Sequence, residues 1–323
     1  MIDRQLLEKA AAAITGSRDL ALACHVGPDG DALGSMIGFG IAARNAGKGV
    51  VAGFGSPFIV PGTLSFLPDD LLVDPDSFPE APETMVVFDA GSPDRLAELG
   101  SPAGDSGTLV VVDHHITNEG FGDIALVDPD AAATGVIVTE LLDVLGWPIT
   151  PDVAICLLTA LVTDTGRFQY ANTNPAALEM AARLVEAGAR PDLISQKVYD
   201  EAPFGYLKVA GIALSRAELD VAARMVSTII TEQDLDEAGV GWGDIDNLIN
   251  TLRLAEEADV AVLAKVHADG QVKLSLRSRG DTDVGALAAA LSGGGHRLAA
   301  GLTFAGPAEN AIDEVRARLE EYR

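Results

Sequence analysis

The chain has 323 residues, with 22 basic and 48 acidic side chains, and its formal net charge is −26. This length predicts two domains, each with its own core. The negative charge excludes a broad basic surface of the kind that binds long nucleic acid, so an anionic substrate should be short or held by a locally positive site.

The first part of the chain alternates apolar strands with helices. Two tetrapeptides, 85–88 and 109–112, are entirely apolar and end at Asp89 and Asp113. Strands that are apolar on both faces and alternate with helices indicate a doubly wound, mainly parallel sheet, which binds ligands beyond the carboxyl ends of its strands. Helices are predicted at 3–15, 32–46, 134–145, 151–162 and 174–187, and strands at 20–26, 49–53, 85–88 and 109–112.

The pattern changes after residue 187. We predict a first α/β domain over 1–187, a connector over 188–215 and a smaller, mixed α/β domain over 216–323, with a cleft between the domains. A turn at Ala268-Asp269-Gly270 joins two strands of the second domain as a hairpin. In that domain strands are predicted at 225–230, 260–267, 272–278 and 300–304, a helix at 283–291 and a loop at 293–296.

The two cysteines and the apolar runs bear on the compartment. Cys24 and Cys156 lie in apolar stretches, which predicts two buried thiols and no disulfide. The first residues lack the apolar core of a signal peptide, and no run reaches the roughly 18 uncharged apolar residues of a membrane span. We therefore expect a cytoplasmic protein that does not bind membranes.

Histidines and aspartates recur at the predicted strand and helix ends. Each cluster alone is ordinary, because Asp-Gly-Asp is usually a turn and an aspartate after a strand is usually a helix cap. Together they place carboxylates from several elements at one edge, and such a cluster needs neutralising cations. Imidazole and carboxylate ligands without thiolate favour Mn²⁺, Fe²⁺ or Co²⁺, and a bridging carboxylate allows two ions roughly 3.5–4 Å apart. The residues are His25, Asp29, Asp31, Asp89, Asp113, His114 and Asp164.

These residues fall into motifs that resemble the DHH phosphoesterases. The first runs from His25 to Ser35 as His-Val-Gly-Pro-Asp-Gly-Asp-Ala-Leu-Gly-Ser, and the second is Asp89. The third is Asp113-His114-His115, and the fourth is Thr163-Asp164-Thr165-Gly166. A later run from Gly293 to Gly301, Gly-Gly-Gly-His-Arg-Leu-Ala-Ala-Gly, resembles the glycine–histidine motif of the accompanying DHHA1 domain. Among these the chain resembles the short two-domain members, which are nano-RNases that also act on 3′-phosphoadenosine 5′-phosphate, and related cyclic-dinucleotide phosphodiesterases.

The resemblance implies a role for each residue. One metal ion would be held by His25, Asp29 and Asp89. The other would be held by Asp31, Asp89, His114 and Asp164, with Asp89 as the bridge. Asp113 would orient a ligand histidine, and His115 would contact the substrate phosphate or assist proton transfer. The catalytic residues are therefore predicted to be His115, Asp113 and Asp31.

The second domain is predicted to hold a phosphate. The segment 271–297 contains four basic and two acidic residues, which is a local excess of positive charge in an acidic chain. The glycine triplet either forms an anion-binding nest or is a flexible turn. Lys273 and Arg279 either add to this positive site or lie on a solvated face. By the resemblance, the substrate-binding residues would be His115, Arg277, Gly293, Gly294, Gly295 and His296.

Two features of the first domain have alternative roles. Phe168 or Tyr170 could stack on a base, although packing is the ordinary role of Phe168. The Thr134-Gly135 amides could bind an anion at a helix start, or the pair could be a simple helix cap.

The resemblance implies a Mn²⁺-dependent phosphoesterase with two ions per subunit, Mg²⁺ or Co²⁺ being alternatives. We expect it to hydrolyse short oligoribonucleotides and linear dinucleotides to 5′-mononucleotides as a homodimer. 3′-Phosphoadenosine 5′-phosphate and cyclic di-AMP are further candidate substrates. An inorganic pyrophosphatase-like hydrolase and a non-catalytic nucleotide-binding regulator are the alternatives.

Overall fold

The computed structural model describes residues 2–323 and, for His296, the backbone alone. Contacts divide the chain into two compact units, Met1–Glu201 and Ala202–Arg323. The segment 188–215 contains α7 (Pro191–Ser195), a π-helical turn (Gln196–Asp200) and α8 (Phe204–Ser215), and the division between the units falls just before α8. The α/β class predicted for both parts of the chain is confirmed.

The first unit contains a five-stranded sheet in which every neighbouring pair is parallel, in the order β2-β1-β3-β4-β5. Strand β5 was not predicted, because it has only four residues and its side chains alternate between buried and half-buried. The strand order changes direction between β1 and β3, which is where ligands bind in open parallel sheets. The strands are β1 (Asp19–Cys24), β2 (Gly49–Gly53), β3 (Thr84–Phe88), β4 (Thr108–Asp113) and β5 (Ile124–Val127).

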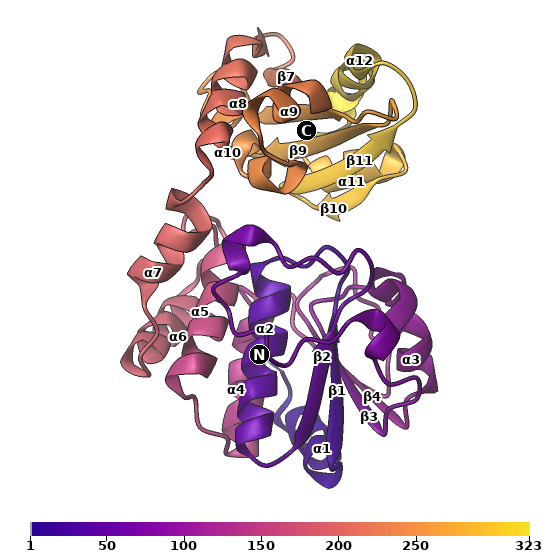
Figure 1. Ribbon diagram of the computed structural model, residues 1–323, viewed down its shortest axis with the longest axis vertical. Coiled ribbons are helices and arrows are strands. Elements are labelled where there is room, and N and C mark those ends of the chain that lie inside the picture. The colour runs from indigo at the N-terminus through magenta and orange to yellow at the C-terminus, as the bar shows by residue number, and fades with distance from the viewer. Residues whose placement is uncertain (1) are drawn as a thin grey trace. The chain divides into compact units, whose positions relative to one another are not determined.

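Helices cover both faces of this sheet, as the apolar strands predict. Figure 1 shows α2 and α4 on one side of the strands and α3 on the other. The first face is covered by α1 (Arg4–Gly16), α2 (Gly30–Asn45) and α4 (Thr134–Leu145). Helix α5 (Pro151–Asp164) packs on α2 and α4, and α6 (Pro175–Glu186) packs on α5. The second face is covered by a 3₁₀ segment (Pro93–Leu99) and α3 (Gly100–Asp105), while two further 3₁₀ turns span Gly62–Leu64 and Pro75–Ser77.

Helix α2 is packed against α5 by a row of glycines at every fourth position. A Cβ on Gly30 would lie 2.4 Å from the Thr163 side chain, and one on Gly34 would lie 2.4 Å from the Cys156 carbonyl oxygen. Because these positions lack a Cβ, the two helices approach closely. The first turn of α2 therefore lies beside the last turn of α5.

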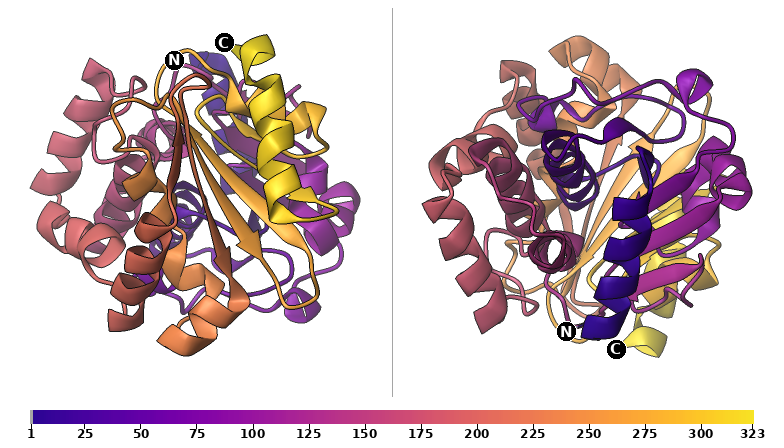
Figure 2. Two further views of the ribbon diagram at one scale, coloured as in Figure 1. Left: turned by 90° about the horizontal axis from the view of Figure 1, so that it is seen from above. Right: turned by 90° about the horizontal axis from the view of Figure 1, so that it is seen from below.

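The second unit contains a six-stranded mixed sheet in the order β10-β11-β9-β8-β7-β6, in which only β7 and β8 pair in parallel. Figure 2 shows these strands in orange and yellow. Helices α11 and α12 cover one face, and α8, α9 and α10 cover the β7–β8 half of the other. The strands are β6 (Glu218–Asp220), β7 (Met225–Thr231), β8 (Val260–Val266), β9 (Val272–Ser278), β10 (Gly294–His296) and β11 (Ala299–Phe304).

The helices of this unit are α9 (Glu232–Ala238), α10 (Leu248–Leu252), α11 (Val284–Ala290) and α12 (Ala308–Arg318), with 3₁₀ turns at Trp242–Ile245 and Leu319–Tyr322. The hairpin predicted around Asp269 is confirmed, since β8 and β9 are antiparallel neighbours. The loop predicted at 293–296 is wrong, because residues 294–296 form an edge strand paired with β11. Glycine-rich sequence is poor in strand propensity, and the pairing with β11 overrides it.

Two other predictions concern the cysteines and the membrane. Cys24 and Cys156 are both free and buried, which confirms the prediction of two buried thiols. Within residues 2–323, none of the helices combines the length and the apolar character needed to cross a bilayer.

Candidate metal centre

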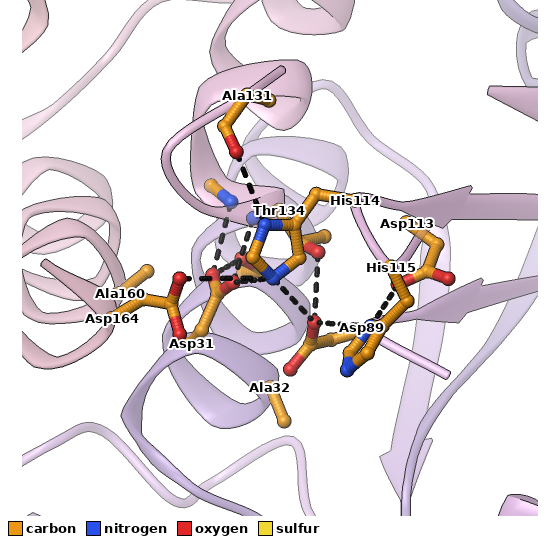
Figure 3. Close-up of polar contacts among 12 residues, drawn as sticks. Asp31, Ala32, Asp89, Asp113, His114, His115, Ala131, Thr134, Ala160 and Asp164 are labelled. Atoms are coloured by element: carbon orange, nitrogen blue, oxygen red, sulfur yellow. Dashed lines mark hydrogen bonds and ion pairs between the residues drawn. The ribbon is translucent and has the colours of Figure 1, made fainter. Parts of the chain in front are cut away.

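The predicted ligands meet at the carboxyl edge of the parallel sheet. His25 follows β1, Asp89 follows β3, and His114 follows β4. Asp31 lies in the first turn of α2 and Asp164 is the last residue of α5. Figure 3 shows the His114 ring facing the carboxylates of Asp31, Asp89 and Asp164. The topology brings together residues up to 139 positions apart in the sequence (His25 and Asp164).

The first group of donor atoms surrounds His25. Its Nε2 lies 3.5 Å from Asp89 Oδ2 and 3.9 Å from Asp29 Oδ1. Asp29 is also the N-cap of α2, where its Oδ1 accepts hydrogen bonds from the amides of Asp31 and Ala32. The helix start therefore holds this carboxylate toward His25.

The second group surrounds His114. Its Nε2 lies 3.7 Å from one oxygen of each of three carboxylates, Asp31 Oδ2, Asp89 Oδ1 and Asp164 Oδ2. Asp89 thus presents Oδ2 to the His25 group and Oδ1 to the His114 group. This is the arrangement of a carboxylate that bridges two ions.

These separations fit divalent cations better than direct contacts. At 3.5–3.9 Å the nitrogen and oxygen atoms are too far apart for hydrogen bonds. An ion bound at about 2.0–2.2 Å from each donor would hold its ligands at such spacings. Three such groups of donor atoms come together: His25, Asp29 and Asp89; Asp31, His114 and Asp164; and Asp89, His114 and His115.

Backbone carbonyls orient both ligand histidines. Nδ1 of His25 lies 3.0 Å from the Val26 carbonyl oxygen, and Nδ1 of His114 lies 3.1 Å from that of Ala131. A carbonyl only accepts, so each Nδ1 carries the proton in these contacts. Each Nε2 then presents its lone pair to the carboxylates, as a metal ligand must.

The start of α4 holds the Asp31 carboxylate. The amides of Thr134 and Gly135 donate to Asp31 Oδ2 and Oδ1 at 2.6 and 3.1 Å, and the Ser35 hydroxyl donates to Oδ1 at 2.9 Å. The Thr134 hydroxyl donates to Asp89 Oδ1 at 3.0 Å. The anion at this helix start is therefore a carboxylate of the protein. Anion binding by the Thr134 and Gly135 amides was one of the two alternatives in the sequence, but its partner Asp31 and the hydroxyl contact with Asp89 were not predicted, because they depend on tertiary structure.

The carboxylates and histidines perturb one another strongly. Burial raises the pKa of Asp31 well above its usual range and that of Asp164 to about 7. Burial opposes protonation of His114, but the surrounding carboxylates outweigh it and raise its pKa to about 9. Burial also disfavours ionised Asp89, yet the adjacent His25 imidazole and the positive charge of His114 hold its pKa well below the usual range. Without cations, protons must therefore offset part of this negative charge.

Backbone conformation positions the Asp89 carboxylate, and the side chain of Asn172 positions that of Asp164. Asp89 has φ 54°, in the left-handed region that few non-glycine residues adopt. Asn172 donates its amide to the Asp164 side chain at 3.3 Å and to the backbone oxygens of Asp164 and Ala132 at 3.1 and 2.9 Å. Asn172 was not predicted as a site residue.

Asp113 is fully buried and holds a histidine. Its Oδ1 accepts from His115 Nδ1 at 2.7 Å, and its Oδ2 accepts from Asn118 at 2.6 Å. The ring that Asp113 contacts is therefore His115, beside the predicted ligand His114. Asn118 was also missed by the sequence argument, since it belongs to none of the motifs.

In the second unit the predicted phosphate-binding residues lie in register across the sheet. His296 pairs with Ala299, and Ala299 pairs with Arg277. The side chain of His296 lies outside the described part of the chain. The Arg277 side chain donates to the Leu276 carbonyl oxygen at 3.0 Å and is half-buried.

The glycine triplet has a packing role. A Cβ on Gly293 would lie 2.3 Å from the Gly301 carbonyl oxygen, and one on Gly295 would lie 2.5 Å from that of Ala299. Gly294 has open space. Arg279 donates to the carbonyls of Ala255 and Glu256, and Lys273 is exposed.

Of the two aromatic residues considered for stacking, Phe168 packs against the core of the first unit. The ring of Tyr170 packs against Gly166, because a Cβ on that glycine would lie 2.3 Å from the ring. Both rings therefore make contacts within the first unit.

Comparison with known proteins agrees with this geometry. Residues 20–161 match the DHH family, N-terminal domain, and residues 221–322 match the DHHA1 domain. The chain is similar to the bifunctional oligoribonuclease and PAP phosphatase NrnA of Thermus thermophilus, with 34% identity over 92% of this chain and 89% of that protein. The protein of the same name from Bacillus subtilis is 28% identical, over 92% of each chain.

Solved structures share the fold. An exopolyphosphatase-related protein from Bacteroides fragilis has a TM-score of 0.91, covers 100% of this chain and 97% of its own, and is 24% identical. RecJ from Thermus thermophilus, solved with Mn²⁺, has a TM-score of 0.57 at 15% identity, covering 99% of this chain and 55% of its own. Both domains match, and a relative is 34% identical over 92% of this chain. The chain therefore belongs to the DHH phosphoesterase family, in the form that carries a DHHA1 domain.

Proposed function

We propose that this phosphoesterase hydrolyses short oligoribonucleotides and linear dinucleotides to 5′-mononucleotides with two Mn²⁺ ions. The observation that carries the proposal is the Asp89 carboxylate, whose two oxygens face two separate histidine–aspartate groups. The likeness to the two oligoribonucleases called NrnA supports the substrate class. The PAP phosphatase activity in the names of these two proteins makes 3′-phosphoadenosine 5′-phosphate a further proposed substrate. Cyclic di-AMP is another, because the chain is also similar to a cyclic-di-AMP phosphodiesterase over 66% of its length.

In this proposal the residues divide the work as follows. His25, Asp29 and Asp89 hold one ion, and Asp31, Asp89, His114 and Asp164 hold the other. Divalent ions at such a site polarise phosphoryl oxygens and generate a nucleophile from water near neutral pH. Asp113 holds His115 through Nδ1, and His115 contacts the substrate phosphate or moves a proton. A manganese complex of a protein with the same fold makes Mn²⁺ the first ion to test, before Mg²⁺ or Co²⁺.

The second unit is proposed to hold an end of the substrate. Arg277 and His296, in register across the sheet, would bind a phosphate beside Gly294 and Gly295, whereas the Gly293 amide already donates to the Ala288 carbonyl oxygen at 2.7 Å. A net charge of −26 penalises long polyanions more than fragments of a few nucleotides. Both features favour short substrates.

Two alternatives differ in their products. The match to the DHHA1 domain argues against an inorganic pyrophosphatase, because by the resemblance those enzymes carry a different second domain. A non-catalytic regulator would bind a dinucleotide and leave it intact. Catalysis is supported by the donor atoms of His25, Asp29, Asp31, Asp89, His114 and Asp164, which form groups of three within 4.8 Å of one another.

The test is a product assay on metal-stripped protein with and without Mn²⁺. Substrates are 5′-phosphorylated diadenylate, cyclic di-AMP, 3′-phosphoadenosine 5′-phosphate, pyrophosphate and a long RNA strand. We expect Mn²⁺-dependent release of AMP, fastest from the linear dinucleotide. Rapid hydrolysis of pyrophosphate alone would favour the pyrophosphatase, and binding without turnover would favour the regulator.

We also propose a homodimer in the cytoplasm. The dimer is supported by the family resemblance alone, and the compartment by the two free, buried cysteines. Light scattering on the purified protein tests the dimer, since a monomeric mass at micromolar concentration would contradict it.

A further inference from the structure

Arg95 lies next to the candidate metal centre but belongs to none of the sequence motifs. It lies in the 3₁₀ segment Pro93–Leu99, and its backbone oxygen accepts the amide of Val26 at 2.9 Å. Its side chain is exposed, and Nη2 lies 3.4 Å from Nδ1 of His25. The backbone contact thus ties this segment to the loop that carries His25.

The contact with His25 is not a hydrogen bond when that histidine binds a metal. Nδ1 of His25 then carries the proton that it donates to the Val26 carbonyl at 3.0 Å. A guanidinium has donors only, so Arg95 and Nδ1 would present two donors to each other. Arg95 therefore needs a different acceptor in the metal-bound form.

Within residues 2–323, no carboxylate oxygen lies within 4.0 Å of the Arg95 guanidinium. The nearby carboxylates Asp29 and Asp89 face Nε2 of His25, on the other side of the ring. When His25 carries its proton on Nδ1, Arg95 has no carboxylate acceptor among the described residues beside the candidate metal centre, which suits it to an oxyanion. Arginine is the side chain best suited to phosphate, because its planar donors match two oxygens at once.

We propose that Arg95 is a substrate-binding residue that donates to a non-bridging oxygen of the phosphoryl group being hydrolysed, on the His25 side of the cluster. The inference rests on the proposed function, since it takes a phosphate ester as the substrate. The interaction neutralises charge that develops on that group in the transition state.

The test compares Arg95→Ala with Arg18→Ala. Arg18 is also exposed and lies before β1, at the opposite end of the strand from His25, so it controls for the change in net charge. Three quantities are measured: kcat/KM on 5′-phosphorylated diadenylate, the affinity for Mn²⁺ by calorimetry, and the affinity of the Mn²⁺-loaded protein for AMP.

We expect Arg95→Ala to lower kcat/KM by about 10- to 100-fold, the range for a hydrogen bond to a charged group, and to weaken AMP binding. Mn²⁺ should bind as tightly as before or more tightly, because a nearby positive charge is gone. Arg95→Lys should be intermediate, since it keeps the charge without the planar donors. Arg18→Ala should match the wild type in all three measurements.

Loss of Mn²⁺ affinity in Arg95→Ala would overturn the proposal, because Arg95 would then act through His25. Wild-type activity and AMP affinity in Arg95→Ala would also overturn it, as would equal losses in Arg18→Ala. If the wild type cleaves no substrate while Arg95→Ala still weakens AMP binding, the proposed function fails but the phosphate contact stands.

Discussion

The backbone amide of Thr134 donates to Asp31 Oδ2 at 2.6 Å, so the first turn of α4 holds a carboxylate from the first turn of α2. Helix starts stabilise negative charge through their free amides and dipole. In this protein the anion is a predicted metal ligand buried to 1% exposure. Part of the desolvation of Asp31 is therefore offset by the fold itself, which keeps this carboxylate in place.

The Thr134 hydroxyl is predicted to support the metal site through Asp89. Thr134→Val keeps the size of the side chain and the backbone amide but removes the 3.0 Å hydrogen bond to Asp89 Oδ1. We expect about 10- to 100-fold weaker Mn²⁺ binding, as for other partners of metal ligands. Calorimetric titration with Mn²⁺ checks this. Thr139→Val is the matched control in the same helix, because its hydroxyl donates only to the Gly135 carbonyl, and equal losses in both variants would contradict the prediction.

Removal of Asp31 should separate metal binding from folding. Asp31→Ala deletes a proposed ligand of the second ion, so we expect turnover to fall by about 100-fold or more, which corresponds to about 3 kcal/mol of lost transition-state stabilisation. Far-UV circular dichroism should be unchanged. In the wild type, Mn²⁺ at 100 times its Kd stabilises the fold by about 2.7 kcal/mol, and in Asp31→Ala most of that gain should be lost. Thermal unfolding with and without Mn²⁺ measures this stabilisation. Wild-type turnover by a metal-loaded Asp31→Ala would refute the mechanism.

The close approach of α2 and α5 should tolerate no Cβ at Gly34. The added atom would lie 2.4 Å from the backbone oxygen of Cys156, and backbone cannot move aside cheaply. We expect Gly34→Ala to lower the free energy of unfolding by about 1–3 kcal/mol and to weaken Mn²⁺ binding, because Asp31 and Asp164 would move apart. Gly211→Ala in α8 is the control, since its Cβ would meet open space. This variant should raise the free energy of unfolding by about 0.5–1 kcal/mol. Urea unfolding of both variants distinguishes these outcomes.

The stability of the second unit should depend on pH through Asp234. The hydrogen bonds from Arg216, at 2.7 and 2.8 Å, lower the pKa of Asp234 to about 2. Because the folded pKa lies below the unfolded value of about 3.8, the stabilisation is complete above about pH 4 and is lost as the pH falls toward 2. Because the Arg216 side chain is about half exposed, solvent screens this ion pair and reduces the stabilisation to about 1 kcal/mol.

The measurement is the difference in the free energy of unfolding between wild type and Asp234→Asn at several pH values. The difference should be largest near pH 6 and shrink as the pH falls to 2.5. The exposed neighbour Asp236→Asn should show no such trend. A difference that stays constant with pH would mean that the charge of Asp234 contributes nothing.

Local sequence determined much of this protein. Apolar strands that end in Asp89 and Asp113 predicted a parallel sheet with acids at its carboxyl edge. This was possible because a strand buried on both faces is apolar at every position, which the local sequence shows. The family of the enzyme follows from the same motifs. Strand β10 was missed for the converse reason. Its glycines have low strand propensity, and the strand forms through pairing with β11, a tertiary contact.

Tertiary structure alone decided which groups support the ligands. Thr134 contacts Asp31 and Asp89 from a helix distant in sequence, and Asn172 reaches Asp164 from the loop that follows α5. The sequence did not identify these partners, because the contacts depend on how the chain folds. The same holds for Arg95, which is brought to His25 by a backbone hydrogen bond to Val26. A metal ligand is recognisable from its residue type and its position at a strand end, whereas its hydrogen-bond partner depends on how helices and loops pack in three dimensions.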